Sequence, residues 1–297
     1  MKPVNDAMNN RTSSRFDYQS LVNEIVRDPE VAAFIEEHQL NAEEIRRSIS
    51  NFSQFISERE LYQRGQGSYL SKGYQPILIM NQGYADVSYK ETTELIAAER
   101  AKEIRNRVHL LNLPNSLRGI SLQDVDPDDR WGTIQELTRY LLNYPQDSKG
   151  FYLYGDFGIG KTYLLAALAN DLARHKEVET TLLHFPTFVL DLKNGFDEKT
   201  YHRQLNQVKG VPVLMIDDIG AEVFTPWLRD EVLQIILQHR MQERLPTFFS
   251  SNLSFDELQV RMAQGRAGDE TWQATRIMER MRFLAKEIHV PGQNRRN

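Results

Sequence analysis

Residues 155–162 of the chain read Gly155-Asp156-Phe157-Gly158-Ile159-Gly160-Lys161-Thr162, which matches the pattern G-x-x-x-x-G-K-[ST]. An apolar stretch from Phe151 to Tyr154 comes before this motif, and a stretch rich in alanine and leucine, Lys161 to Arg174, follows it. In the order strand, glycine-rich loop and helix, backbone N–H groups and a helix N-terminus surround a phosphate group. The motif therefore predicts a nucleotide-binding P-loop over residues 155–162.

Two side chains at the end of the motif have specific roles in this chemistry. Lys161 can reach the β- and γ-phosphates of ATP, and the hydroxyl of Thr162 can bind Mg²⁺. We therefore expect ATP and Mg²⁺ as ligands, with Thr162 as one of the metal ligands.

A second segment supplies the acids that a P-loop needs. Val213 to Ile216 is an apolar strand pattern, and it ends in Asp217 and Asp218. We expect Asp217 to hold Mg²⁺, directly or through water, and Asp218 to orient and activate the attacking water. Glu222, four residues after Asp218, is a second candidate for that water.

Polar and basic residues later in the chain complete the candidate site. Asn252 follows the apolar strand pattern Thr247–Phe249, at the strand end that faces the ligand crevice of an open α/β sheet. We expect Asn252 to contact the attacking water or the γ-phosphate. Arg276, Arg280 and Arg282 lie on one late helix, where Arg276 and Arg280 share a face. One of these arginines could act on a neighbouring subunit's nucleotide, and a solvent-exposed helix face is the alternative.

Apolar strand patterns alternate with helical patterns over the second half of the chain. The predicted strands are Phe151–Tyr154, Thr181–Phe185, Val211–Ile216 and Thr247–Ser250, and the predicted helices are Lys161–Arg174, Phe188 towards Gly195, and Trp227–Arg244. Nearly continuous apolar strands separated by helices indicate an α/β fold, with a parallel sheet covered by helices on both faces.

The first hundred residues are predicted to form a smaller, mostly helical domain with one β-hairpin. Asp28-Pro29 and the pair Asn41 and Glu44 are typical of helix starts. The hairpin strands are Pro76–Met80 and Tyr84–Tyr89, and a charged helix is expected over Glu91–Leu111. The expected core residues are Phe34, Ile35, Ile45, Ile49, Phe52, Ile77, Ile79 and Val87. Turn-rich sequence then places the boundary, so we predict a domain at 1–105, a linker at 106–125 and a domain at 126–297.

Composition narrows the class of protein. The chain has 297 residues, a formal net charge of −5, 40% hydrophobic residues and no cysteine. The charge does not indicate binding to nucleic acid by the chain as a whole. Disulfides and thiolate metal sites are excluded. No stretch approaches the ~20 apolar residues of a membrane-spanning helix, so we expect a cytoplasmic protein without a membrane partner.

Four motifs together resemble the bacterial DnaI/DnaC helicase loaders. They are Gly155–Thr162, Leu214–Glu222, Leu245–Asn252 and Ile277–Met281, and the likeness covers nearly all of residues 130–297. It implies an AAA+ ATPase domain that handles single-stranded DNA and can self-assemble. It also implies an N-terminal domain that binds the replicative helicase during primosome assembly.

The resemblance also implies roles for individual residues. Asp218 falls on the family's water-activating position, Asn252 on its sensor position and Arg280 on its arginine-finger position. Arg295 and Arg296 lie in a tail where such loaders can carry a further sensing arginine. The mixture of Lys193, Lys199, Tyr201, His202 and Arg203 suits single-stranded nucleic acid, although an ordinary solvated helix explains it equally well.

One departure from the family concerns zinc. The family's N-terminal domain holds zinc through cysteines and a histidine, whereas this chain has no cysteine and has Gln75 where the histidine is expected. We therefore expect no zinc.

Other functions are compatible with the same P-loop. A transposase-helper ATPase shares these motifs, a small-molecule kinase is a further alternative, and a third is an adaptor that uses ATP only as a structural ligand.

Overall fold

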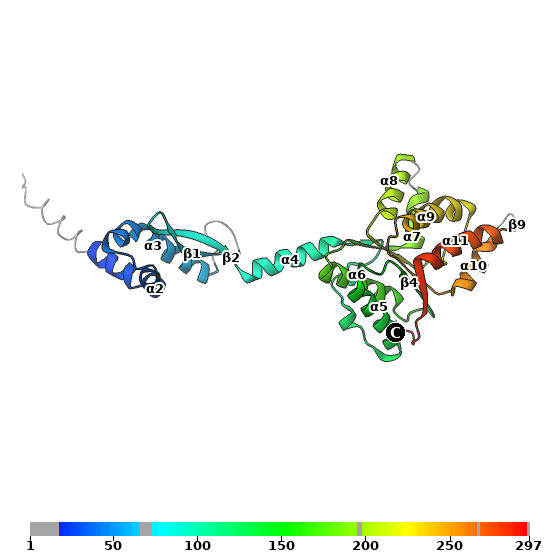
Figure 1. The fold of residues 1–297 in the computed structure, drawn as a ribbon, viewed down its shortest axis with the longest axis horizontal. Helices are drawn as coiled ribbons and strands as arrows, with labels where there is room; N and C mark the ends of the chain where they lie inside the picture. The colour runs from blue at the N-terminus through cyan, green and yellow to red at the C-terminus, as the bar shows by residue number, and fades with distance from the viewer. Residues whose placement is uncertain (1–17, 66–72, 195–197, 266–267, 296–297) are drawn as a thin grey trace, which may run out of the picture. The chain divides into compact units, whose positions relative to one another are not determined.

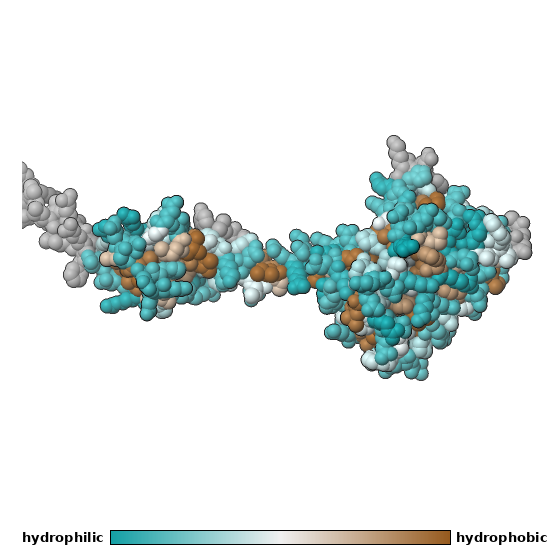
Figure 2. Space-filling model, in the orientation of Figure 1, coloured by the Kyte–Doolittle hydropathy of each residue, from teal (hydrophilic) through white to brown (hydrophobic). Residues whose placement is uncertain are grey.

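The computed structural model describes residues 18–65, 73–194, 198–265 and 268–295. The chain forms two compact units, of which the first ends at Arg100 and the second begins at Ala101 (Figure 1). No helix among the described residues is long and apolar enough to cross a bilayer. In the view of Figure 2 their surface is mainly hydrophilic, with scattered hydrophobic residues.

The helices of the first unit begin where their capping residues predict. Helix α2 spans Pro29–Glu37, and the carboxylate of Asp28 accepts hydrogen bonds from N–H groups of its first turn. Helix α3 spans Ala42–Gln63. Its predicted capping box is confirmed, because Asn41 and Glu44 each accept a hydrogen bond from the other's backbone N–H. Caps of this kind satisfy N–H groups that have no partner inside a helix.

The predicted hairpin is also confirmed. Strand β1 (Tyr74–Asn81) pairs antiparallel with β2 (Tyr84–Glu91), and Leu78 lies opposite Val87. One face of this hairpin packs on α3. The core of the unit consists of Ile25, Val31, Phe34, Leu40, Phe52, Phe55 and Ala85, with Ile35, Ile45, Ile49, Ile56, Leu78 and Val87 partly buried against it.

Two residues predicted for this core lie elsewhere. Ile77 and Ile79 were expected to pack with Val87, but the core side of β1 is the one that carries Leu78. Successive side chains of a strand point to opposite faces, so Ile77 and Ile79 are on the other face. Ile79 is 38% exposed.

A six-stranded sheet organises the second unit, in the order β10-β4-β7-β6-β5-β3, and every neighbouring pair is parallel. The strands are β3 (Val108–Leu111), β4 (Gly150–Tyr154), β5 (Thr180–His184), β6 (Val213–Asp217), β7 (Thr247–Ser251) and β10 (Ala285–His289). A two-residue pair, β8 (Gln264–Gly265) and β9 (Gly268–Asp269), lies outside this sheet. Parallel neighbours place the carboxyl ends of the strands at one edge, which is where a ligand site is expected.

Helices cover both faces of this sheet (Figure 1). One core contains side chains of α5 and α6, and the other contains side chains of α7 to α11. Helix α4 (Thr93–Arg107) precedes β3 and contains the boundary between the two units. The later helices are α5 (Trp131–Asn143), α6 (Lys161–His175), α7 (Phe185–Asn194), α8 (Glu198–Lys209), the π-helix η4 (Trp227–Leu233), α9 (Gln234–Gln242), α10 (Phe255–Ala263) and α11 (Thr271–Leu284). Short 3-10 turns are η1 (Asn115–Leu117), η2 (Leu122–Asp124) and η3 (Asp128–Arg130). The predicted α/β class, with a smaller helical unit and hairpin before it, is confirmed.

The segment between the predicted domains differs from the prediction. The helix expected over Glu91–Leu111 ends at Arg107, and β3 then pairs with β5 at the edge of the sheet. Residues 106–125, expected to be a linker, also carry Leu122 and Val125, which are buried in the core around α6. Burial of these side chains against α6 outweighs the turn-rich sequence around them.

Two further details of the sheet and its helices were not predicted. Strand β10 adds a parallel edge to β4. The helix expected over Trp227–Arg244 instead begins as a π-helix, continues as α9 and ends at Gln242.

Candidate functional site

The P-loop lies where the sequence predicts it, between β4 and α6. Gly155 and Gly160 are both required by the geometry. A Cβ at Gly155 would lie 2.5 Å from the carbonyl oxygen of Val290, and Gly160 has a left-handed φ of 93° as the N-cap of α6. Only glycine adopts such a φ without strain. The loop backbone is thereby free to turn towards a phosphate at the helix N-terminus.

The other loop residues have different environments. Phe157 is 68% exposed and lines the cavity beside the loop together with Gly158, whereas Ile159 is buried in the core. Asp156 is exposed and uses its carbonyl oxygen as an acceptor.

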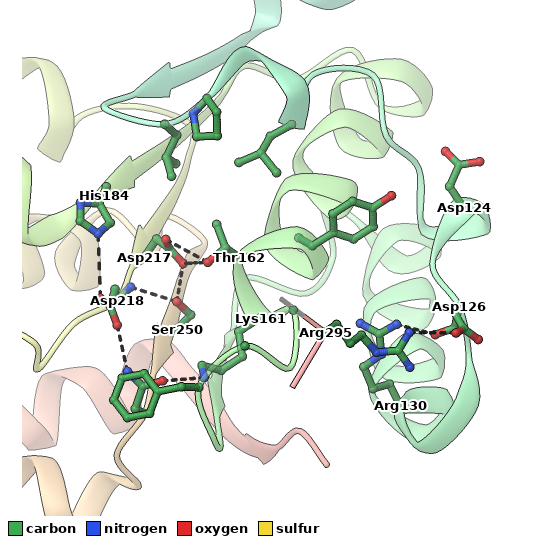
Figure 3. Close-up of a pocket in the computed structure, with 18 residues that line it drawn as sticks. Asp124, Asp126, Arg130, Lys161, Thr162, His184, Asp217, Asp218, Ser250 and Arg295 are labelled. Atoms are coloured by element: carbon green, nitrogen blue, oxygen red, sulfur yellow. Dashed lines mark hydrogen bonds and ion pairs between the residues drawn. The ribbon is translucent and has the colours of Figure 1, made fainter. Parts of the chain in front are cut away.

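Lys161 connects the P-loop to the end of β7. Its Nζ donates to the carbonyl oxygens of Gly155 and Asp156 at 2.8 Å each, and to Oδ1 of Asn252 at 2.7 Å (Figure 3). These three acceptors are neutral oxygens, and they fix the position of the ammonium beside the loop. An ammonium in this position is suited to a phosphate anion.

Thr162 and Asp217 meet across the loop and the sheet. The hydroxyl of Thr162 donates to Oδ1 and Oδ2 of Asp217 at 2.8 and 3.1 Å, and Ser250 donates to Oδ1 of the same carboxylate at 2.5 Å. Burial raises the pKa of Asp217 above its usual value, and the hydroxyls of Ser250 and Thr162 act in the opposite direction. A buried carboxylate beside a threonine hydroxyl is an oxygen ligand set that suits Mg²⁺, so these residues fit that ion.

Asp218 is presented differently from its neighbour. It has a left-handed φ of 60°, and its backbone N–H donates to Ser250 Oγ at 3.0 Å. Asn252 Nδ2 donates to Asp218 Oδ1 at 3.2 Å, while Nε2 of His184 lies 3.9 Å from Oδ2. The Asp218 side chain is 34% exposed. Asn252 therefore contacts both Lys161 and Asp218. In the sequence these three residues lie on three separate segments.

A cavity of about 740 Å³ joins these groups. Its lining includes polar residues of the P-loop, β6 and β7, and also the apolar residues Leu113, Pro114 and Leu117. Such a combination of an apolar wall and a few convergent polar groups is typical of small-molecule sites.

Several residues of this cavity were not singled out from the sequence, and three of them contact the P-loop or the two aspartates. His184 ends β5, Ser250 lies on β7, and Arg130 ends η3. Arg130 is 3% exposed, donates to the carbonyl oxygens of Ile159 and Asp126 at 3.2 and 2.7 Å, and its Nε has no partner among the described atoms. The strand-end position of His184 was a usable signal, but nothing near Arg130 in the sequence points to the P-loop.

The C-terminal tail also reaches this cavity. The backbone N–H of Arg295 donates to the carbonyl oxygen of Gly158 at 3.0 Å. Its guanidinium donates to Asp126 at 2.8 Å (Figure 3). The same group donates to Asp128, also at 2.8 Å. Arg296 lies outside the described residues.

The late arginines lie away from the P-loop cavity. Arg276, Arg280 and Arg282 line a separate hollow of about 620 Å³ on α11. Arg282 is bound by Asp256 at 2.8 Å. The structure therefore does not bring Arg280 to the P-loop of its own chain.

Glu222 is not among the residues that line the cavity. Its Oε1 accepts a hydrogen bond from Gly220 N at 3.2 Å, and burial raises its pKa to about 7.

The basic and aromatic residues of α7 and α8 meet η4. Lys193 Nζ lies 5.7 Å from the ring centroid of Trp227, and the ring of Tyr201 lies 6.3 Å from the same ring. His202 and Arg203 are exposed on α8, and the Lys199 side chain lies outside the described set.

A zinc site was tested on the same structure. No group of three or more histidine, aspartate or glutamate side chains among the described residues is placed to hold a metal ion. His38 packs its ring at 4.4 Å from that of Phe34. The residues described do not fit the family's zinc site, and the absence of zinc stays a prediction.

Two family models match the chain. One, described as the primosomal protein DnaI N-terminus, matches residues 1–89, and the other, for IstB-like ATP binding proteins, matches residues 83–297. The second match covers the P-loop, both aspartates and Asn252.

Individual proteins are similar over the same regions. The replicative helicase loader DnaI of Bacillus subtilis (strain 168) is 36% identical over 312 aligned positions, covering 100% of both chains. A crystal structure of DnaI is 40% identical, with a TM-score of 0.56 over 65% of this chain and 100% of that one. A crystal structure of the DnaC helicase loader shares the fold at 20% identity, with a TM-score of 0.52 over 60% of this chain and 100% of that one.

Proposed function

The chain belongs to the DnaI family of replicative helicase loaders, and from this we propose that it uses ATP to load the replicative DNA helicase onto single-stranded DNA. Its likeness to the B. subtilis loader extends over the whole chain, including the region before the ATP-binding part. That extent favours a loader over a transposase helper or a kinase, which would share only the P-loop part.

One observation carries the ATPase part of the proposal: Lys161, Asn252 and Asp218 form a continuous hydrogen-bonded row beside the Thr162–Asp217 pair. ATP hydrolysis needs these functions side by side. The P-loop amides and Lys161 bind the phosphates, and Asp218 orients the attacking water. Asn252 contacts both groups, so it is positioned to respond to the γ-phosphate.

Thr162 and Asp217 would hold Mg²⁺, which neutralises developing phosphate charge when bound. Ser250 keeps Asp217 and Asp218 in register, because its hydroxyl donates to one and accepts from the other's backbone. Leu113, Pro114 and Leu117 provide the apolar wall on which the base of the nucleotide would lie.

The remaining ATPase role is assigned to a second copy of the chain. Arg280 would act on the nucleotide of a neighbouring subunit, since it does not line the cavity of its own chain. Self-assembly through the second unit is therefore part of the proposal.

The first unit would bind the helicase. It corresponds to the predicted domain 1–105, and its apolar core is built from α2, α3 and the hairpin. No thiolate is available and carboxylates with scattered histidines bind zinc poorly, so we propose a metal-free domain. The zinc content of the purified full chain tests this point, and stoichiometric zinc would refute it.

Single-stranded DNA would lie along the basic and aromatic side chains of α7, α8 and η4. Lys193 and Trp227 provide a cation beside an aromatic ring, and Arg203 is an exposed cation nearby in the sequence. Backbone charge and ring stacking are the two contributions that bind single strands without sequence preference.

The division of roles predicts different defects for two substitutions. Lys161→Ala removes the ammonium that binds the phosphates, so we expect ATP affinity to fall at least about tenfold. Asp218→Asn keeps that ammonium and should bind ATP normally, but hydrolysis should fall by about 10²-fold or more because general-base contributions are of that size. Equilibrium binding of a fluorescent ATP analogue and phosphate release measure the two effects. Equal loss of binding in both variants would contradict the assignment.

A further inference from the structure

Helices α9 and α11 present two matched rows of side chains. Arg276 and Arg280 are one turn apart on α11, and Gln234 and Gln238 are one turn apart on α9. Gln238 Oε1 accepts from Arg280 Nε at 2.9 Å, and Gln234 Oε1 accepts from Arg276 Nη2 at 3.3 Å. Each arginine is thus oriented by the amide of one glutamine.

Two other contacts fix these guanidinium groups. Nη1 of Arg280 donates to the carbonyl oxygen of Arg276 at 2.8 Å. Arg276 lies over the ring of Trp272 at 4.8 Å from its centroid, and Trp272 is 67% exposed. All of these partners are neutral.

The described residues therefore leave the charge of this pair without a carboxylate partner. Among the described residues, no carboxylate lies within ion-pairing distance of Arg276 or Arg280, whereas Arg282 on the same helix is bound by Asp256 at 2.8 Å. Burial, together with the neighbouring charge of Arg276, lowers the pKa of Arg280 below its usual value. Two adjacent cations with neutral supports repel each other, and an anion placed between them would relieve that repulsion.

Within the described part of the chain, Lys161 is the P-loop's own cation, and the arginines of the cavity have other partners. The lining arginines in the described chain are Arg130 and Arg295. Arg130 is buried and donates to backbone carbonyls, while Arg295 is bound by two carboxylates. A transition state with charge on its phosphate oxygens needs further positive charge, which a second copy could supply.

We propose that Gln234 and Gln238 are positioning residues that hold Arg276 and Arg280 as an uncompensated pair, and that the pair binds the terminal phosphates of a nucleotide in a second copy of this chain. The inference rests on the proposed ATPase function and extends it, because it assigns two arginines and their two supports in place of a single arginine. A glutamine is suited to this task, since its amide orients a guanidinium without neutralising it, whereas a glutamate would form an ion pair.

Gln238→Glu tests the inference with an almost isosteric change. The new carboxylate should capture Arg280, so we expect hydrolysis by the full-length protein at assembling concentrations to fall at least tenfold. ATP affinity should stay within twofold, and the melting temperature should not fall, because the variant gains an ion pair. Gln234→Glu should act in the same direction through Arg276.

Gln259→Glu is the matched control. Gln259 accepts a hydrogen bond from Arg282 at 3.1 Å, but that arginine is already paired with Asp256. We expect the Gln259→Glu variant to hydrolyse ATP at the rate of the wild type.

Mixing experiments identify the site on which the arginines act. Gln238→Glu subunits mixed with Asp218→Asn subunits should recover part of the activity, because one kind of interface then pairs an intact arginine row with an intact P-loop.

Three results would overturn the inference. Two of them are loss of hydrolysis in Gln238→Glu without recovery on mixing, and full hydrolysis by Gln238→Glu alone. Weaker binding of a single-stranded oligonucleotide at unchanged hydrolysis would also overturn it, by assigning the pair to nucleic acid. If the wild type fails to hydrolyse ATP, the proposed function itself is refuted, and the inference with it.

Discussion

Asp217 and Asp218 are adjacent in the sequence and have opposite environments. Asp217 is 3% exposed and receives hydrogen bonds from two hydroxyls, whereas about a third of the Asp218 side chain is exposed to the cavity. The left-handed φ of Asp218 turns the chain at this point. Non-glycine residues in this conformation are uncommon and often occur at functional sites. These opposite environments support the proposal that Asp217 holds the metal ion and Asp218 orients the attacking water.

Glu222 provides a pH-dependent prediction at the residue scale. One of its carboxylate oxygens is buried without a partner, and burial raises its pKa to about 7 from the ordinary value of 4.5. As pH rises between these values, the unfolded chain loses this proton before the folded chain does. The folded state then binds more protons, so stability falls across this window and the loss is complete above pH 7.

We therefore expect Glu222→Gln to be more stable than the wild type at pH 8, by about 2 kcal/mol, since one pKa unit corresponds to about 1.4 kcal/mol and the site is partly open to water. At pH 5 the two proteins should have similar stability. Melting curves from pH 5 to pH 8 measure the difference, with the exposed Glu179→Gln as control. A difference that does not change with pH would contradict the buried, protonated state of Glu222.

At this scale the sequence predicted the P-loop and both aspartates, because phosphate and Mg²⁺ chemistry fixes the residue types and their spacing. It did not predict the roles of Ser250, His184 or Arg130. Their partners come from other strands and turns, so their contacts depend on strand order, which no local pattern contains.

Among the elements, α9 is joined to β6 and β7 by one fully buried arginine. Arg240 donates to Thr247 Oγ1 at 2.8 Å and to four carbonyl oxygens, of which those of Val211 and Pro246 are nearest at 2.7 and 2.6 Å. Burial without a carboxylate partner lowers its pKa to about 9. Arg240 therefore fixes the start of the two strands whose other ends carry Asp217 and Asn252.

Arg240→Met keeps most of the side-chain volume but removes the guanidinium donor from all of these acceptors, of which the Pro246 carbonyl keeps only the N–H of Leu214 at 3.1 Å. We expect a loss of about 3 kcal/mol or more in the free energy of unfolding, because each unsatisfied buried polar group costs about 1–3 kcal/mol. All three tryptophans, at positions 131, 227 and 272, lie in the second unit. Urea unfolding followed by tryptophan fluorescence therefore reports on this unit.

Arg139→Met is the control for this measurement. Arg139 is 63% exposed and forms a surface pair with Glu136, and such pairs contribute 0–1 kcal/mol. Equal effects of the two substitutions would show that Arg240 does not anchor the strands.

The elements that were predicted correctly have strong local signals. Strands β4, β5, β6 and β7 each contain a short apolar run, and α2 and α3 have clear caps. The edge strands β3 and β10 were missed because each has only four or five residues, most of them exposed or half-buried, next to a helical pattern. Their strand conformation depends on pairing with β5 and β4, which is a tertiary effect.

The whole molecule combines two units with separate cores, one built on a hairpin and two helices and the other on the six-stranded sheet. This separation suits a protein that holds one partner while another part responds to ATP. The response to ATP would come from the hydrogen-bonded row of Lys161, Asn252 and Asp218. The catalytic site would be complete only when a second copy of the chain supplies its arginines.

The central claim of the proposed function is that ATP turnover controls the transfer of the helicase to DNA. The most direct measurement is the amount of replicative helicase that remains on closed-circular single-stranded DNA after incubation with the full-length protein and ATP. We predict efficient transfer by the wild type and no transfer above background by Lys161→Ala. Asp218→Asn should form a complex with helicase and DNA that does not release the loader. Transfer by Lys161→Ala at the rate of the wild type would contradict the account.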